Sequence, residues 1–161
     1  MLERLAECAE EKIVSELAAK VPTPDKPKNQ RYTLHVETHS RAEFKDVTSQ
    51  IEQLIERSGI SSGQCHLFVP HTSAAILINE NSDPGLRQDI TDFLKTLAPP
   101  GANYHHDDGN CDSHLKATLI GVTRTLLIEN HRLLLGRWQG IYFCEFDGPR
   151  RRDLYVKLVS D

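Results

Sequence analysis

The chain has 161 residues, 39% of them hydrophobic and 26% charged, a composition typical of a folded globular protein and unlike that of a disordered one. Its 19 lysines and arginines stand against 23 aspartates and glutamates, and the resulting formal net charge of -4 argues against a dedicated nucleic-acid-binding protein. No run of 18 apolar residues predicts a membrane span, and the four scattered cysteines predict reduced thiols in a cytoplasmic protein.

The first thirty residues differ in pattern from the rest of the chain. Apolar residues recur at helical spacing from Leu2 to Leu17, and three prolines follow among polar residues. We therefore expect residues 1–30 to form a helix and a proline-rich linker, appended to a compact domain over residues 31–161. The helix would pack on that domain or on a neighbouring subunit.

Within the domain the apolar pattern changes repeatedly between strand and helix periodicity. Alternating or short apolar runs predict strands at 31–38, 64–70, 74–79, 123–128, 133–135, 141–146 and 154–159. Helical spacing predicts one helix from 46 to a stop at Gly59, a second from 83–85 to 97, and a short third over 115–120. Strands and helices do not alternate regularly, so the sequence predicts an α+β fold with a largely antiparallel sheet or sandwich and two to three helices.

A long polar loop over residues 98–113 concentrates titratable side chains. It contains two histidines and three aspartates and leads into His114. Histidine and carboxylate are ligands of zinc and related cations, although the interval from His106 to His114 is not a recognised metal spacing and a solvated loop explains it equally well. If Asp112 or Ser113 caps the third helix, His114 lies at a helix N-terminus, where free N–H groups favour phosphate.

Further polar residues follow two of the predicted strands. His71, Thr72 and Ser73 form a turn after one strand, and Glu80 and Asn81 close the next. At strand ends these side chains either orient a substrate or metal or bond within their own turns. The sequence leaves both readings open.

The segment 145–152, Glu-Phe-Asp-Gly-Pro-Arg-Arg-Arg, carries two acids at a turn and then three arginines. Arginine binds phosphate in a bidentate manner. The alternative is a solvated turn with weak surface ion pairs. Trp138, a little earlier, is expected in the core.

Taken in order, these segments resemble the motifs of the YjbQ family, also called secondary thiamine-phosphate synthase-like proteins. The likeness spans roughly residues 31 to 160 and rests on five motifs in the family's order. Together these motifs identify the family more strongly than any single motif would. The matching segments are 71–75 with 78–81, Tyr104-x-His106-Asp107, Asn110-x-x-x-His114 with Lys116-Ala117, Gly136-x-Trp138-Gln139, and 145–152.

The resemblance implies an α+β fold that assembles as a homotrimer, with a pocket near the subunit boundaries. Carried over by position, the implied ligands of a divalent metal are His71, His106 and His114, with zinc as the first expectation and magnesium or manganese as alternatives. The implied catalytic residues are Glu80, Asp147 and Arg150. The implied substrate or phosphate ligands are Thr72, Ser73, Asn81, Arg150 and Arg152. The chain departs from the family in its first thirty residues and at Cys111, beside the implied ligands.

The resemblance also implies a weak thiamine-phosphate synthase activity, in which a pyrimidine pyrophosphate joins a thiazole phosphate and pyrophosphate leaves. Two alternatives stay open: a metal-dependent hydrolase of another phosphorylated metabolite, or a non-enzymatic trimeric ligand-binding module with residues 1–30 as a contact arm. In all three the expected partners are further copies of the chain and a small phosphorylated molecule, with no nucleic acid and no membrane.

Overall fold

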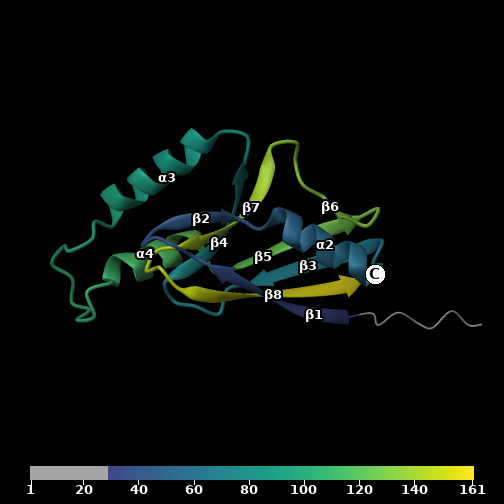
Figure 1. Ribbon diagram of the computed structural model, residues 1–161, viewed down its shortest axis with the longest axis horizontal. Helices are drawn as coiled ribbons and strands as arrows, with labels where there is room; N and C mark the ends of the chain where they lie inside the picture. The colour runs from purple at the N-terminus through teal and green to yellow at the C-terminus, as the bar shows by residue number, and fades with distance from the viewer. Residues whose placement is uncertain (1–28) are drawn as a thin grey trace, which may run out of the picture.

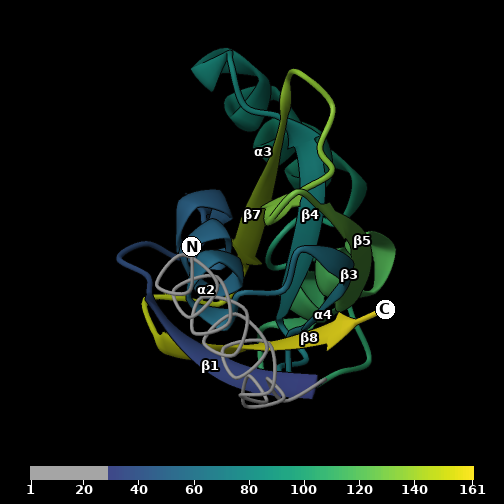
Figure 2. The same ribbon diagram turned by 90° about the vertical axis from the view of Figure 1, so that its right-hand side faces the viewer.

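The computed structural model describes residues 29–161, so the helix and linker expected over residues 1–30 lie almost wholly outside the described residues. Two sheets form the frame: a five-stranded sheet in the order β1-β8-β3-β5-β6 and a three-stranded sheet in the order β2-β7-β4 (Figures 1 and 2). The strands are β1 (Asn29–Glu37), β2 (Glu43–Asp46), β3 (Ser62–Phe68), β4 (Ala74–Glu80), β5 (Thr123–Glu129), β6 (Arg132–Leu133), β7 (Gln139–Glu145) and β8 (Arg151–Ser160). Every pairing among them is antiparallel, which confirms the predicted fold class.

Strand β7 is buried on both faces, because successive side chains of a strand point to opposite sides. Ile141 and Phe143 enter the larger core, which lies between the two sheets and helix α2 (Thr48–Ser58). Tyr142 and Cys144 enter a smaller apolar cluster on the other face of the three-stranded sheet. This double burial is why the segment reads as a continuous apolar run rather than an alternating one.

Helix α2 follows its predicted pattern closely. Ile51, Leu54 and Ile55 form its buried stripe. Gly59 ends the helix in the left-handed region with φ of 70°, and its N–H bonds to the carbonyls of the last turn. The short strand β2 just before α2 was not predicted, because its four residues contain only one apolar side chain.

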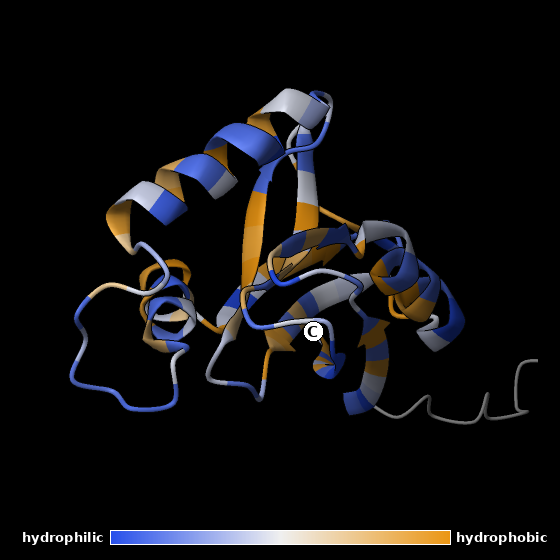
Figure 3. Ribbon diagram, turned by 60° about the vertical axis from the view of Figure 1, so that its left-hand side comes forward, coloured by the Kyte–Doolittle hydropathy of each residue, from blue (hydrophilic) through white to orange (hydrophobic). Residues whose placement is uncertain are grey.

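Helix α3 (Pro84–Leu97) begins where the sequence predicts, with the Asp83 carboxylate accepting a hydrogen bond from the Gly85 N–H. Its apolar stripe is only partly covered: Leu94 is buried in the smaller cluster, but Phe93 and Leu97 are 64% and 55% exposed. Figure 3 shows α3 as a separate rod at the edge of the molecule, with apolar and polar positions alternating along it.

Helix α4 (Cys111–Ile120) begins four residues before its predicted start, with Asn110 as the N-cap residue. Asp112 and Ser113 do not cap it, because both side chains are buried and bond to residues beyond the first turn. No helix among residues 29–161 is both long enough and apolar enough to span a membrane.

Candidate functional site

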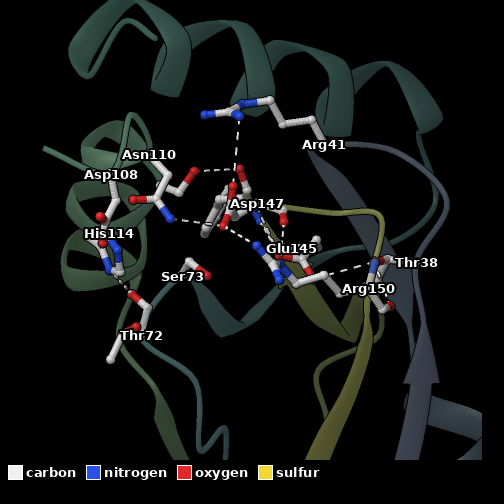
Figure 4. Close-up of polar contacts among 12 residues, drawn as sticks. Thr38, Arg41, Thr72, Ser73, Asp108, Asn110, His114, Glu145, Asp147 and Arg150 are labelled. Carbon is white, nitrogen blue, oxygen red and sulfur yellow. Dashed lines mark hydrogen bonds and ion pairs between the residues drawn. The ribbon is translucent and has the colours of Figure 1, made fainter. Parts of the chain in front are cut away.

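Three segments that are far apart in the sequence meet at one end of the molecule: the start of β4, the turn between β7 and β8, and the start of α4 (Figure 4). The pairing of β4 with β7 places Ala74 opposite Glu145, so Ser73 lies beside the turn. The Ser113 hydroxyl then donates to the Phe146 carbonyl over 2.6 Å and ties α4 to the same place.

A buried ion pair lies at the centre of this region. Glu145 is fully buried and accepts two hydrogen bonds from Arg152, from Nε at 2.6 Å and from Nη2 at 2.7 Å. The backbone N–H groups of Phe146 and Asp147 also donate to Glu145, at 3.1 and 2.9 Å, and Arg152 Nη2 donates to the Ser73 hydroxyl at 2.9 Å. Arg152, expected to bind phosphate, is therefore engaged in holding the turn.

Asp147 connects this buried pair to the surface. Its Oδ2 accepts from Asn110 at 2.9 Å and from Arg150 at 2.8 Å, and its Oδ1 lies 3.8 Å from Arg41 (Figure 4). Burial acts to raise the pKa of Asp147, but the hydrogen bonds from Asn110 and Arg150, with the charges of Arg150 and Arg41, outweigh it and hold the pKa below its usual value. Arg150 is half exposed and offers its remaining N–H groups to solvent or to an anion.

The His106 and His114 rings approach each other, with their centroids 5.0 Å apart. His114 Nδ1 lies 3.1 Å from the carbonyl oxygen of Thr72. A carbonyl can only accept, so this contact places the His114 proton on Nδ1 and leaves the Nε2 lone pair free. Metal-binding imidazoles are commonly oriented in this way by a carbonyl behind the ring.

His106 is held more loosely than His114. Its Nδ1 accepts from the Asp108 N–H over 3.4 Å, its Nε2 lies 3.9 Å from the Asp108 carboxylate, and its side chain is 40% exposed. Among residues 29–161 no group of three or more His, Cys, Asp or Glu side chains is placed to hold a metal ion. Residues 29–161 thus bring two imidazoles together, one fewer than the three protein ligands of a catalytic zinc site.

His71 faces a different partner. Its Nε2 accepts a hydrogen bond from the Asp153 N–H at 2.9 Å, which places the proton of the neutral ring on Nδ1. Burial, and next the charge of Arg152, lower the pKa of His71 and outweigh the opposing effect of the nearby carboxylates. A metal could bind His71 only by displacing this hydrogen bond. His71 and His114 nevertheless line one shared cavity of about 620 Å³, with largely apolar walls.

The structure does not bring Glu80 and Asn81 to this site within one chain. They lie at the opposite end of β4, where Glu80 pairs with Gln139, whereas Ala74 pairs with Glu145. Six residues of extended strand separate the two ends, roughly 20 Å at 3.3 Å per residue. Asn81 Nδ2 donates there to Asp46 at 2.8 Å.

Trp138 lies at that same far end, and the expectation that it packs in the core is wrong. It is 57% exposed, and the Arg137 guanidinium lies over its ring at 5.0 Å. It lies in the polar turn just before β7, where no apolar layer of residues 29–161 covers the indole.

Three residues of the site were not predicted from their own residue types. Thr38 Oγ1 accepts from the Arg150 N–H at 2.9 Å and fixes the base of the turn, and Arg41 bonds to Asp112 at 2.9 Å. Asn110 donates to Asp147, and its Oδ1 is buried with no hydrogen-bond partner in the described part of the chain. Thr38 and Arg41 lie in a polar stretch with no motif, and only the family pattern pointed to Asn110.

Comparison with known proteins gives one consistent result. Residues 32–161 match the model of the family described as UPF0047 protein YjbQ-like. A UPF0047 protein of Methanocaldococcus jannaschii is 45% identical over 130 residues, which cover 81% of this chain and 94% of that protein. The UPF0047 protein YugU of Bacillus subtilis is 41% identical over 129 residues, which cover 80% of this chain and 98% of that protein.

Solved structures agree with the sequence comparison. A YjbQ/UPF0047 family protein from Clostridium acetobutylicum superposes with a TM-score of 0.78 at 42% identity, covering 80% of this chain and 99% of that one. A YbjQ-like protein of unknown function from Sulfolobus solfataricus gives a TM-score of 0.80 at 36% identity, covering 83% and 99%.

Proposed function

This chain belongs to the YjbQ-like UPF0047 family, and from that premise we propose that the site at the start of α4 binds a small phosphorylated molecule together with a divalent metal ion, zinc in the first place. One observation carries the proposal. His114 has its proton fixed on Nδ1 by the Thr72 carbonyl, its Nε2 is free, and the His106 ring lies beside it. Two neighbouring imidazoles, of which His114 has a free Nε2, suit zinc, copper, iron or nickel better than magnesium.

The residues around this pair have different roles in binding. His106 and His114 hold the cation, which when bound polarises a phosphate oxygen or balances the charge of a leaving group. Arg150 binds the phosphate, and Asp147 orients Arg150 through its carboxylate and its carbonyl oxygen. His71 offers its Nδ1–H as a neutral donor to the cavity that it shares with His114.

Metal content tests the first part of this proposal. Wild-type protein dialysed against zinc and then against metal-free buffer should retain stoichiometric metal in elemental analysis, and His106→Ala and His114→Ala should each lose it. His66→Ala is the matched control, because its imidazole bonds to Thr125 on the five-stranded sheet and takes no part in the pair. Metal-free wild type, or metal retained in His114→Ala, would contradict the assignment.

The reaction that we propose first is the formation of thiamine phosphate, because pyrophosphate needs a cation and an arginine to leave. Wild-type protein and the His114→Ala variant are incubated with the pyrimidine pyrophosphate and the thiazole phosphate, and thiamine phosphate is measured. Product above the level of the variant supports the synthase. If neither protein forms product but wild type hydrolyses a member of a phosphoester panel with added zinc, the site is a hydrolase instead.

We also propose that further copies of the chain complete the site, as in a homotrimer. Two imidazoles leave the cation short of ligands, and apolar side chains beside His114 are uncovered: Leu115, Leu119 and Phe68 are 41%, 59% and 43% exposed.

Light scattering should give a mass three times that of one chain. Leu119→Lys should lower it and release zinc, whereas the equally exposed Leu134→Lys should not; a monomeric wild type would rule out this part.

A further inference from the structure

A cleft of about 520 Å³ opens between α3 and β2, and it is separate from the histidine site. The side chains of α4 show the separation. Asp112 and Lys116, one turn apart, line this cleft, whereas His114 and Thr118 line the other cavity. Positions two residues apart on a helix point about 200° apart, so the two cavities lie on opposite sides of α4.

The cleft is positively charged in an acidic protein. Its lining carries four cationic side chains and two carboxylates, although the chain as a whole has a formal net charge of -4. The cations are Arg41 on the β1–β2 connection, Arg87 and Lys95 on α3, and Lys116 on α4. Figure 4 shows Arg41 extending beneath α3.

Lys116 is the buried cation of this cleft. Its side chain is only 6% exposed, and its Nζ donates to Asp112 at 2.7 Å. An ammonium has three donors, and no other acceptor within residues 29–161 takes the remaining two, although Lys116 lines the cleft. Buried charged donors are unfavourable unless something satisfies them, and water or an anion in the cleft can supply the acceptor atoms.

Arg87 adds a second cation to the cleft. Its guanidinium lies 5.8 Å from the centre of the Tyr142 ring and forms no ion pair with a carboxylate in the described part of the chain. The walls beside these cations are apolar and partly aromatic: Phe44 and Phe146 pack edge to face at 6.2 Å, and both line the cleft.

We propose that this cleft is a second binding site, for a small aryl phosphate: a phosphate monoester that carries one aromatic ring. The phosphate dianion accepts from Arg41, Arg87 and Lys116, and the ring lies against Phe44 and Phe146. The volume is in the range of small-molecule pockets. This site goes beyond the proposed function, because it needs neither histidine and neither His71 nor Arg150 lines it.

Phenyl phosphate is the probe, with affinity measured by isothermal titration calorimetry on the full chain after removal of metal. The test variant is Arg87→Gln/Lys95→Gln, chosen because neither side chain is buried and Arg87 has no ion pair to break. Arg57→Gln/Lys157→Gln is the charge-matched control, with both side chains exposed and outside the cleft. Arg150→Gln and His114→Ala remove the groups of the histidine site.

Affinity for phenyl phosphate should fall about tenfold or more in the Arg87→Gln/Lys95→Gln variant, since the charge-assisted hydrogen bond from Arg87 and the positive charge of Lys95 are lost. It should stay within about twofold of wild type in the control, Arg150→Gln and His114→Ala proteins, and should weaken as salt is added. Phenol should not compete, and inorganic phosphate should bind more weakly than phenyl phosphate.

Three results would overturn the cleft site. The first is no binding of phenyl phosphate by wild type at millimolar concentration. The second is unchanged affinity in Arg87→Gln/Lys95→Gln. The third is loss of binding in Arg150→Gln or His114→Ala alone, which would assign the phosphate to the histidine site and so favour the proposed function without the second site.

Discussion

At the scale of single residues, the site is organised around one carboxylate with no access to water. Glu145 accepts from Arg152 and from two backbone N–H groups, so the β7–β8 turn is fixed before any ligand arrives. A buried pair of this kind contributes little net stability compared with an apolar pair, but removal of one partner leaves an uncompensated charge. Its use here is to hold Asp147 and Arg150 in place.

Glu145→Gln should therefore destabilise the protein by roughly 3–5 kcal/mol, because it leaves the Arg152 guanidinium buried without a counter-charge. Urea unfolding measures the change. The double variant Glu145→Gln/Arg152→Met removes both charges and should recover part of the loss. If Glu145→Gln is as stable as wild type, the pair does not organise the turn. The same follows if the double variant loses more free energy of unfolding than the two single variants lose together.

His71 makes stability depend on pH. Burial and the charge of Arg152 lower its pKa below the ordinary 6.5, so at mildly acid pH the unfolded chain binds a proton that the folded chain does not. The free energy of unfolding should accordingly fall as pH decreases from 6.5 towards the lowered value. In His71→Gln, whose amide oxygen can still accept from the Asp153 N–H, this decline should be smaller. Urea unfolding at several pH values gives both curves; parallel curves would refute the titration.

At the scale of elements, strand β3 depends on one glycine. Gly63 has φ of 150°, and a Cβ atom there would overlap the carbonyl oxygen of Val159 on the adjacent β8. β3 lies between β5 and β8 in the middle of the larger sheet, so neither neighbour is free to move away.

Gly63→Ala should thus be severely destabilising, by more than about 3 kcal/mol, through backbone overlap as well as an unfavourable φ. Gly101→Ala is the matched control, since Gly101 also has a positive φ, of 75°, but has no atom within 4 Å of the added methyl group. It should cost only about 1 kcal/mol. If urea unfolding shows that both variants lose the same free energy of unfolding, the dihedral angle alone matters and the contact with β8 does not.

Helix α4 shows how one short element can serve two cavities. Its buried side packs Ala117 on the smaller apolar cluster, and its other sides carry His114 and the Asp112–Lys116 pair in different directions. The helix has no single apolar stripe, which is why its periodicity marked only the second half as helical.

At the scale of the whole molecule, both apolar clusters consist of side chains within residues 29–161. The family match likewise starts at residue 32. We therefore predict that residues 29–161 fold without residues 1–28.

A chain that begins at residue 29 should keep the free energy of unfolding to within about 1 kcal/mol of the full chain. It should also keep its zinc content and the same number of chains per assembly, if the histidine site and the assembly are built by residues 29–161 alone. Urea unfolding, elemental analysis and light scattering on both chains check this. A loss of assembly in the shorter chain, with stability unchanged, would instead support the earlier alternative that residues 1–30 are a contact arm.

The residue pattern alone was enough to predict the class of the fold and most of its elements. Strand and helix periodicities reflect which side chains must leave water, and that requirement is local, so α2, β1 and β8 lie where the pattern predicts. Glycine and aspartate marked the ends of α2 and α3 for equally local reasons. The five family motifs were also visible in the sequence, because they are runs of residue types.

Which polar residues meet follows from the three-dimensional packing and could not be predicted from the residue pattern. The register between β4 and β7 brings Ser73 to Glu145 and carries Glu80 to the far end, a choice made by pairing across the sheet. Arg152 belongs to the buried scaffold because it lies on the inward face of β8, whereas Arg150 lies in the turn before the strand and is half exposed. Arg41 and Lys116 reach one cleft from elements that are 75 positions apart, and no periodicity within either segment encodes such a distant encounter.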